Sequence, residues 1–149
     1  MLPTKHFIFG LIFAGFLFLI FPKIGLVGFL IIIFSTFLID VDHYLYYVYK
    51  KKNFSLRNAY KWFIKHKKKL LSLPWEQRNK FQTGFCFLHG IEVLLILLIL
   101  WIFISKYFLF VFTGFAFHLL LDSIDQTTYW DRISKVSLVR DYLRIKKLN

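Results

Sequence analysis

Residues 24–50 read IGLVGFLIIIFSTFLIDVDHYLYYVYK, and this stretch decides the fold. Residues 24–39 carry no charged side chain, and the acidic motif Asp40-Val41-Asp42-His43 follows them directly. Four tyrosines come next within residues 44–49. An uncharged helix that ends in an aromatic belt is typical of a membrane span that reaches the lipid–water boundary. We therefore predict one continuous helix over about residues 24–49.

Three further apolar stretches predict spans at about residues 5–21, 84–105 and 107–122. Hydrophobic residues make up 58% of the 149 residues, whereas soluble domains contain about 45–50%. The joints at Pro22-Lys23 and Ser105-Lys106 are short, and short joints pair helices as antiparallel hairpins. The prediction is an all-α membrane protein, a single domain of four transmembrane helices in two hairpins.

The basic residues predict how the spans are oriented. The formal net charge is +12, and eighteen of the twenty Lys and Arg residues lie on one side of the predicted spans. The two short joints hold only Lys23 and Lys106. Since cytoplasmic segments of membrane proteins are rich in Lys and Arg, both termini are expected in the cytoplasm. The expected location is the plasma membrane, as a multi-pass protein.

The basic loop at residues 50–83 is predicted to contain a helix. Ser55 is a plausible N-cap, and Leu56, Tyr60 and Phe63 recur at helical spacing among basic residues. This pattern predicts an interfacial helix attracted by anionic lipid headgroups, although it also suits solvated charge that only sets orientation. The basic tail at residues 123–149 repeats the pattern more weakly. No specific nucleic-acid partner is predicted, because the basic residues flank apolar spans.

Ionisable residues within the spans gather at one end. Each charged side chain costs roughly 2.5–3.5 kcal/mol at mid-membrane, so its presence needs a reason. With alternating helix directions, nearly all of them fall at the predicted cytoplasmic end, and the outer half has none. Asp125, just after the fourth span, is expected to be exposed. The residues expected at the cytoplasmic end of the spans are His6, Asp40, Asp42, His43, His89, Glu92, His118 and Asp122.

Helical spacing pairs imidazoles with carboxylates. His118 and Asp122 are four residues apart, and His89 and Glu92 are three apart, so each pair is expected to share a helix face. Imidazole and carboxylate together are ligands of zinc, iron or manganese. Cys86, the only cysteine, is expected to pack in an apolar helix. The predicted ligands of a divalent metal, with zinc preferred, are His6, Asp40, Asp42, His43, His89, His118 and Asp122.

Two of these residues have alternative or additional roles. Asp42 points away from Asp40 on an ideal helix, so it either orients a ligand histidine or is placed by a distorted turn. Glu92, one turn after His89, is the candidate general base.

The order of these motifs resembles the family of membrane-bound metal-dependent hydrolases, which includes the LexA-binding, inner-membrane-associated hydrolases. The family order is His, Asp-x-Asp-His, His and then His-x-x-x-Asp. Here it is carried by His6, residues 40–43, His89 and residues 118–122. Many relatives have His-Arg-Gly-x-x-His in the third span, where this chain has only His89. The resemblance implies a metal site of these residues and phosphoester chemistry.

Two functions from different classes follow. The first is a membrane-embedded metal-dependent hydrolase that acts on a phosphoester, such as a lipid headgroup, at the cytoplasmic face. The second is a non-enzymatic membrane protein in which the same residues form a structural metal site or a closed His/Asp network. Transport is a weaker third hypothesis, since the ionisable residues mark no continuous path across the bilayer.

Overall fold

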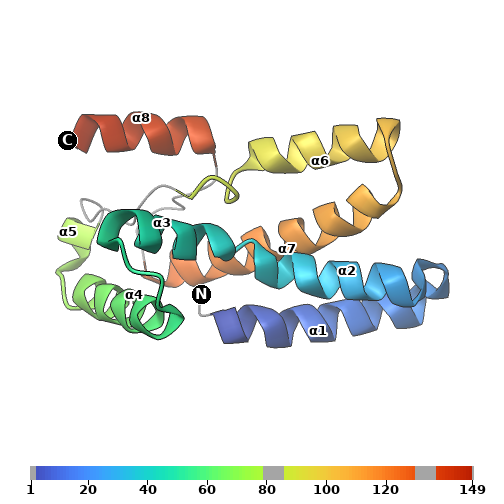
Figure 1. Cartoon of the computed structure of the whole chain (residues 1–149), viewed down its shortest axis with the longest axis horizontal. Coiled ribbons are helices and arrows are strands. Elements are labelled where there is room, and N and C mark those ends of the chain that lie inside the picture. The colour runs from blue at the N-terminus through green and yellow to red at the C-terminus, as the bar shows by residue number, and fades with distance from the viewer. Residues whose placement is uncertain (1–2, 79–85, 130–136, 149) are drawn as a thin grey trace.

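The computed structural model describes residues 3–78, 86–129 and 137–148, and all of its regular elements there are helical. Two antiparallel helical pairs run along the long axis and turn back at the same end (Figure 1). The first pair is α1 (Pro3–Ile20) and α2 (Gly25–Leu38), and the second is α6 (Ile91–Phe103) and α7 (Tyr107–Tyr129). Helix α2 packs against both α1 and α7, so it lies at the centre of the bundle.

The predicted continuous helix at 24–49 is interrupted. Helix α2 ends at Leu38, Ile39 and Asp40 form a turn, and α3 (Val41–Lys51) starts after it. The backbone N–H of Asp40 donates to the carbonyl of Phe37 at 3.3 Å, a bond three residues back where an α-helix would reach four. The tightened turn changes which residues share a face, so Asp40 and Asp42 both turn inward and are buried.

The third predicted span is shorter than residues 84–105. Helix α6 has 13 residues, which at 1.5 Å per residue reach about 20 Å, less than the roughly 30 Å of a bilayer core. The described residues before it, Cys86–Gly90, are not helical, and the start predicted at Gly84 lies outside the described residues. In the part of the chain that the structure describes, three helical stretches are long and apolar enough to cross a membrane: Pro3–Ile20, Pro22–Lys51 and Tyr107–Thr128.

Burial in this bundle suits lipid rather than water. On α1 the buried residues are His6, Gly10 and Ala14, spaced four apart, whereas Ile12 and Leu19 are 63% and 79% exposed. Small and polar side chains therefore face the neighbouring helices, and large apolar ones face outward. Membrane helices use small residues at their contacts in this way, because lipid leaves no hydrophobic reason to bury large ones.

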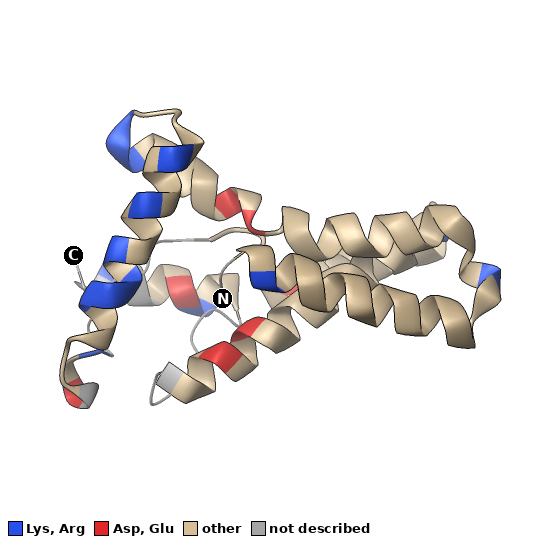
Figure 2. Ribbon diagram, turned by 90° about the horizontal axis from the view of Figure 1, so that it is seen from below, with Lys and Arg blue, Asp and Glu red and all other residues tan. Residues whose placement is uncertain are grey.

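The basic helix predicted after Ser55 is present as α4 (Leu56–Leu71), and the Ser55 hydroxyl accepts a hydrogen bond from the Asn58 N–H at 3.3 Å. Its basic residues lie at the opposite end of the bundle from the hairpin turns, and the helix runs across the bundle axis (Figure 2). The short α5 (Trp75–Arg78) follows α4, and α8 (Leu138–Leu148) lies within the predicted basic tail. Residues 130–136 of that tail lie outside the described residues.

Candidate metal centre

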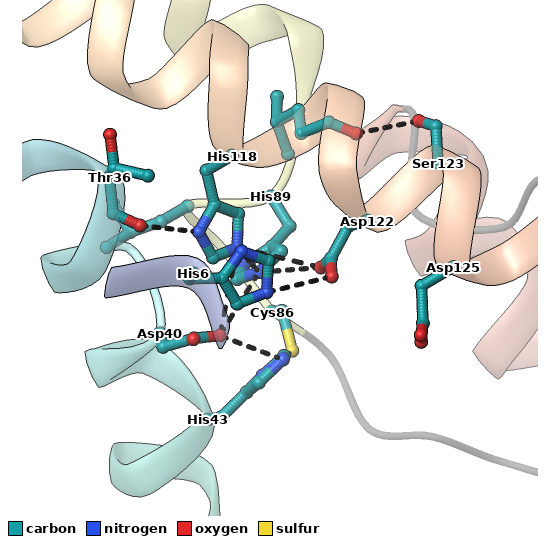
Figure 3. A network of polar contacts seen from close by, with 12 residues as sticks. His6, Thr36, Asp40, His43, Cys86, His89, His118, Asp122, Ser123 and Asp125 are labelled. Atoms are coloured by element: carbon teal, nitrogen blue, oxygen red, sulfur yellow. Dashed lines mark hydrogen bonds and ion pairs between the residues drawn. The ribbon is translucent and has the colours of Figure 1, made fainter. Parts of the chain in front are cut away.

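Buried imidazole, carboxylate and thiol groups meet where four segments of the chain converge (Figure 3). The segments are the start of α1, the α2–α3 turn, the stretch before α6 and the second half of α7. They bring together all seven predicted ligands and add Cys86. Three overlapping groups of these residues could hold a metal ion: His6, His118 and Asp122; Asp40, His89 and His118; and Asp42, His43, Cys86 and His89.

His118 is oriented by the backbone of α2. Its Nδ1 lies 2.7 Å from the carbonyl oxygen of Thr36, so this nitrogen carries the hydrogen and donates. The contact depends on close packing of α2 and α7 at Gly114, one turn before His118. A Cβ at Gly114 would lie 2.6 Å from the carbonyl oxygen of Ile32. Glycine therefore allows the backbone approach that directs Nε2 of His118 toward the centre of the cluster.

His89 is oriented by a carboxylate instead. Its Nδ1 lies 2.9 Å from Oδ2 of Asp42, which also accepts the backbone N–H of Leu88 at 3.0 Å. Asp42 therefore orients a candidate ligand histidine, which is the first of its two predicted roles. The distorted turn, which was the second, is also present directly before it at Asp40. The prediction that His89 and Glu92 share a helix face is wrong, because His89 precedes α6 and Gly90 between them is extended.

The two oriented histidines point their remaining nitrogens at each other. Nε2 of His118 and Nε2 of His89 are 3.1 Å apart. Since each Nδ1 faces an acceptor, both Nε2 atoms of the neutral rings present lone pairs. Two lone pairs at this distance repel unless a proton or a cation lies beside both. The facing nitrogens therefore share either a proton or a metal ion.

Two carboxylates lie beside these nitrogens. Oδ1 of Asp40 lies 3.7 Å from Nε2 of His118 and 3.9 Å from Nε2 of His89. Oδ2 of Asp122 lies 3.6 and 3.5 Å from the same two atoms. A tetrahedral zinc site with bonds of about 2.0–2.2 Å has donors about 3.3–3.6 Å apart. The separations between the two imidazoles and each carboxylate are close to these values, so the imidazoles together with either carboxylate suit such an ion.

His6 extends the cluster beyond Asp122. Its Nε2 lies 3.2 Å from Oδ1 of Asp122, and its ring stacks on His118 with the centroids 3.8 Å apart. Both ring nitrogens of His6 are buried and have no aligned hydrogen bond among the described residues. The same holds for Oδ2 of Asp40 and Oδ1 of Asp42. Buried polar atoms without an aligned hydrogen bond are costly, and a bound cation removes that cost for the oxygens and for an unprotonated nitrogen.

Cys86 is the cluster residue that the sequence interpretation missed. It is buried as expected, but it precedes α6, and its Sγ lies 2.7 Å from Nδ1 of His43. The same Nδ1 is 3.3 Å from Oδ1 of Asp42. Sulfur beside imidazole and carboxylate is a ligand set that zinc accepts. The sequence separation of 43 residues between His43 and Cys86 left no local signal for this contact.

Two acidic side chains have their described contacts elsewhere. The carboxylate of Glu92 accepts hydrogen bonds from the Ser137 hydroxyl at 2.6 Å and from the Leu138 N–H at 2.9 Å, at the start of α8. Its role as general base stays a prediction. Asp125, expected to be exposed, is partly buried and forms an ion pair with Lys67 at 3.2 Å.

Comparison with protein-family models, curated proteins and solved structures finds no match to this chain.

Proposed function

We propose that this chain is a membrane-embedded metal-dependent hydrolase that acts on a phosphoester, such as a lipid headgroup, at the basic end of its bundle. The observation that carries the proposal is the pair of facing Nε2 atoms of His89 and His118, 3.1 Å apart between two carboxylates. A metal ion at this point would contact both nitrogens and a carboxylate oxygen, whereas a metal-free network would need a proton between the two nitrogens. The resemblance of the motif order to the membrane-bound metal-dependent hydrolases adds the reaction class.

The residues divide the work of such a site. Asp40, His89, His118 and Asp122 would hold the ion, and Asp42 and the Thr36 carbonyl fix the two imidazoles by their Nδ1–H groups. A divalent ion bound there acts as a Lewis acid toward water and toward a phosphoryl oxygen. His43 has the most exposed of the histidine side chains in the cluster, at 23%. We therefore place the approach of water and substrate at His43.

The basic end would favour an anionic substrate. The basic residues of α4 lie at the same end of the bundle as the cluster (Figure 2), and positive charge around a site raises the local concentration of anions. By the positive-inside rule this end faces the cytoplasm.

The alternative is a structural metal site without catalysis. It is favoured by burial, because His6, His89 and His118 are at most 1% exposed, and closed, fully ligated sites are typical of structural metals. Both functions require a bound ion and differ in turnover.

The experiment first measures metal in protein purified in detergent, and then hydrolysis of phosphatidic acid and of a soluble phosphomonoester. We expect stoichiometric divalent metal and metal-dependent release of phosphate, both lost in Asp122→Asn and retained in Asp125→Asn. Stoichiometric metal without turnover of a panel of phosphomonoesters and phosphodiesters would favour the structural site. Folded wild-type protein that holds no metal after incubation with zinc, iron or manganese would refute both.

A further inference from the structure

A hollow between α3 and α4 is lined by basic, amide and aromatic side chains and by none of the candidate metal ligands. Its volume is about 360 Å³. Tyr47 and Lys51 line it from α3, and Asn53 lines it from the connecting turn. The α4 residues that line it are spaced at three and four positions, so they form one face of that helix: Asn58, Lys61, Trp62 and Lys65.

The three lysines of the hollow have no acidic partner among the described residues. No acidic residue of the described chain lines it, and Lys51, Lys61 and Lys65 form no ion pair within that part of the chain. Lys67 on the same helix does, with Asp125 at 3.2 Å. Three uncompensated ammonium groups around one hollow repel one another, and an anion placed among them removes that repulsion.

The turn between the helices is held in place and presents a further donor. The Tyr44 hydroxyl donates to the carbonyl of Phe54 at 2.6 Å. The side-chain oxygen of Asn53 accepts the Ser55 N–H at 2.8 Å, so its amide N–H groups are left to donate to a ligand. Ammonium and amide donors around a preformed hollow are suited to phosphate oxygens.

The surroundings of the hollow indicate that the phosphate belongs to a lipid. The hollow adjoins the tyrosine-rich α3, which continues the apolar α2 and corresponds to the interfacial level of a membrane helix. Phe54 and Leu56, which follow Asn53 along the chain, are 78% and 70% exposed, so large apolar side chains project outward from the same connection. Exposed apolar side chains on the same connection as the basic hollow suit the junction of acyl chains and headgroup.

We infer that this hollow binds the phosphate of an anionic phospholipid headgroup, as a site separate from the metal centre. The inference does not depend on hydrolysis, because its evidence is the lysines, the amides and the exposed apolar side chains of the connecting segment. The sequence pattern predicted diffuse attraction of anionic lipid along the basic loop, whereas this inference assigns the lipid one defined binding position.

The test compares two triple variants with equal loss of charge. Lys51, Lys61 and Lys65 are changed to Gln in one, and Lys50, Lys68 and Lys69, which do not line the hollow, are changed to Gln in the other. Native mass spectrometry of the full-length protein, titrated with phosphatidylglycerol in detergent, measures the affinity of the first retained lipid. Circular dichroism checks that both variants keep their helices.

We expect the hollow variant to bind at least about tenfold more weakly than the control variant, since each lysine near anionic lipid contributes about a factor of five. Equal weakening of the two variants would mean diffuse attraction, and no weakening would mean another site; either result overturns the inference. A parallel titration with inorganic phosphate separates the two sources. If the wild type retains no lipid but binds inorganic phosphate at millimolar concentration, and the hollow variant does not, the lipid assignment is overturned.

Discussion

Replacing Asp122 by Asn tests the metal centre most directly. Its carboxylate lies 3.2 Å from His6, 3.5 Å from His89 and 3.6 Å from His118, in each case to Nε2. Asn keeps the size and shape of the side chain and removes the charge. We expect the variant to fold and to bind zinc at least about a hundredfold more weakly, because losing a direct ligand costs at least as much as losing an outer-shell partner of one.

The loss can be read as stability. At a free zinc concentration of 100 times the wild-type dissociation constant, binding stabilises the wild type by about 2.7 kcal/mol. At the same concentration, a hundredfold weaker site gains only about 0.4 kcal/mol. The difference of about 2.3 kcal/mol corresponds to roughly 5–9 °C in midpoint temperature for a chain of this length, on the scale of soluble domains.

The assay is thermal unfolding in detergent with and without zinc, accompanied by metal analysis after dialysis against a chelator. Asp125→Asn is the matched control, because it makes the same change on the same helix at a carboxylate that pairs with Lys67 and belongs to none of the three candidate ligand groups. The control should keep the full zinc-dependent shift. If zinc shifts the wild type and Asp122→Asn equally, Asp122 is not part of a metal site, and the reasoning from the cluster geometry fails.

Three further predictions concern neighbouring features. Cobalt bound by the group of Asp42, His43, Cys86 and His89 should give near-ultraviolet sulfur-to-metal absorption, which Cys86→Ser should abolish; an unchanged spectrum would remove Cys86 from the ligand set. Glu92→Gln should leave the metal content unchanged and speed hydrogen exchange at residues 138–141. The reason is that Glu92 accepts hydrogen bonds from Ser137 and Leu138 at the start of α8, and an N-terminal cap contributes about 0.5–2 kcal/mol. Glu76→Gln is the control, and loss of hydrolysis with α8 undisturbed would instead support Glu92 as a base. Gly114→Ala should lower the unfolding temperature because its Cβ would meet the Ile32 carbonyl, whereas Gly15→Ala, which meets nothing within 4 Å, should be neutral or stabilising; equal effects would show that close packing at Gly114 is not needed.

Local patterns predicted much of the fold. The Ser55 cap and the helix after it follow from residues a few positions apart, and both are present. The two hairpins follow from the short joints. The pairing of His118 with Asp122 also needs only the helical period, and the two side chains lie 3.6 Å apart.

The rest depends on contacts between distant segments. Asp42 accepts from Leu88 and His89, 46 and 47 residues away, and no periodic pattern signals that contact. Apolar residues at 84–105 favoured one long helix, but α6 begins only at Ile91, after an extended Gly90. The same competition between a local helix and distant polar partners explains the turn at Asp40 and the unexpected place of Cys86.

The convergence of four segments has a consequence for how the protein assembles. Residues of the first helix, at His6, and of the last long helix, at His118 and Asp122, complete the same group. A nascent chain inserts its helices in order, so the group is incomplete until α7 has docked against α2. Metal capture by this group would therefore come last in biogenesis and would report that insertion is finished. A chain released before α7 would leave its early histidines and aspartates in the bilayer without the partners that α7 supplies, which is costly.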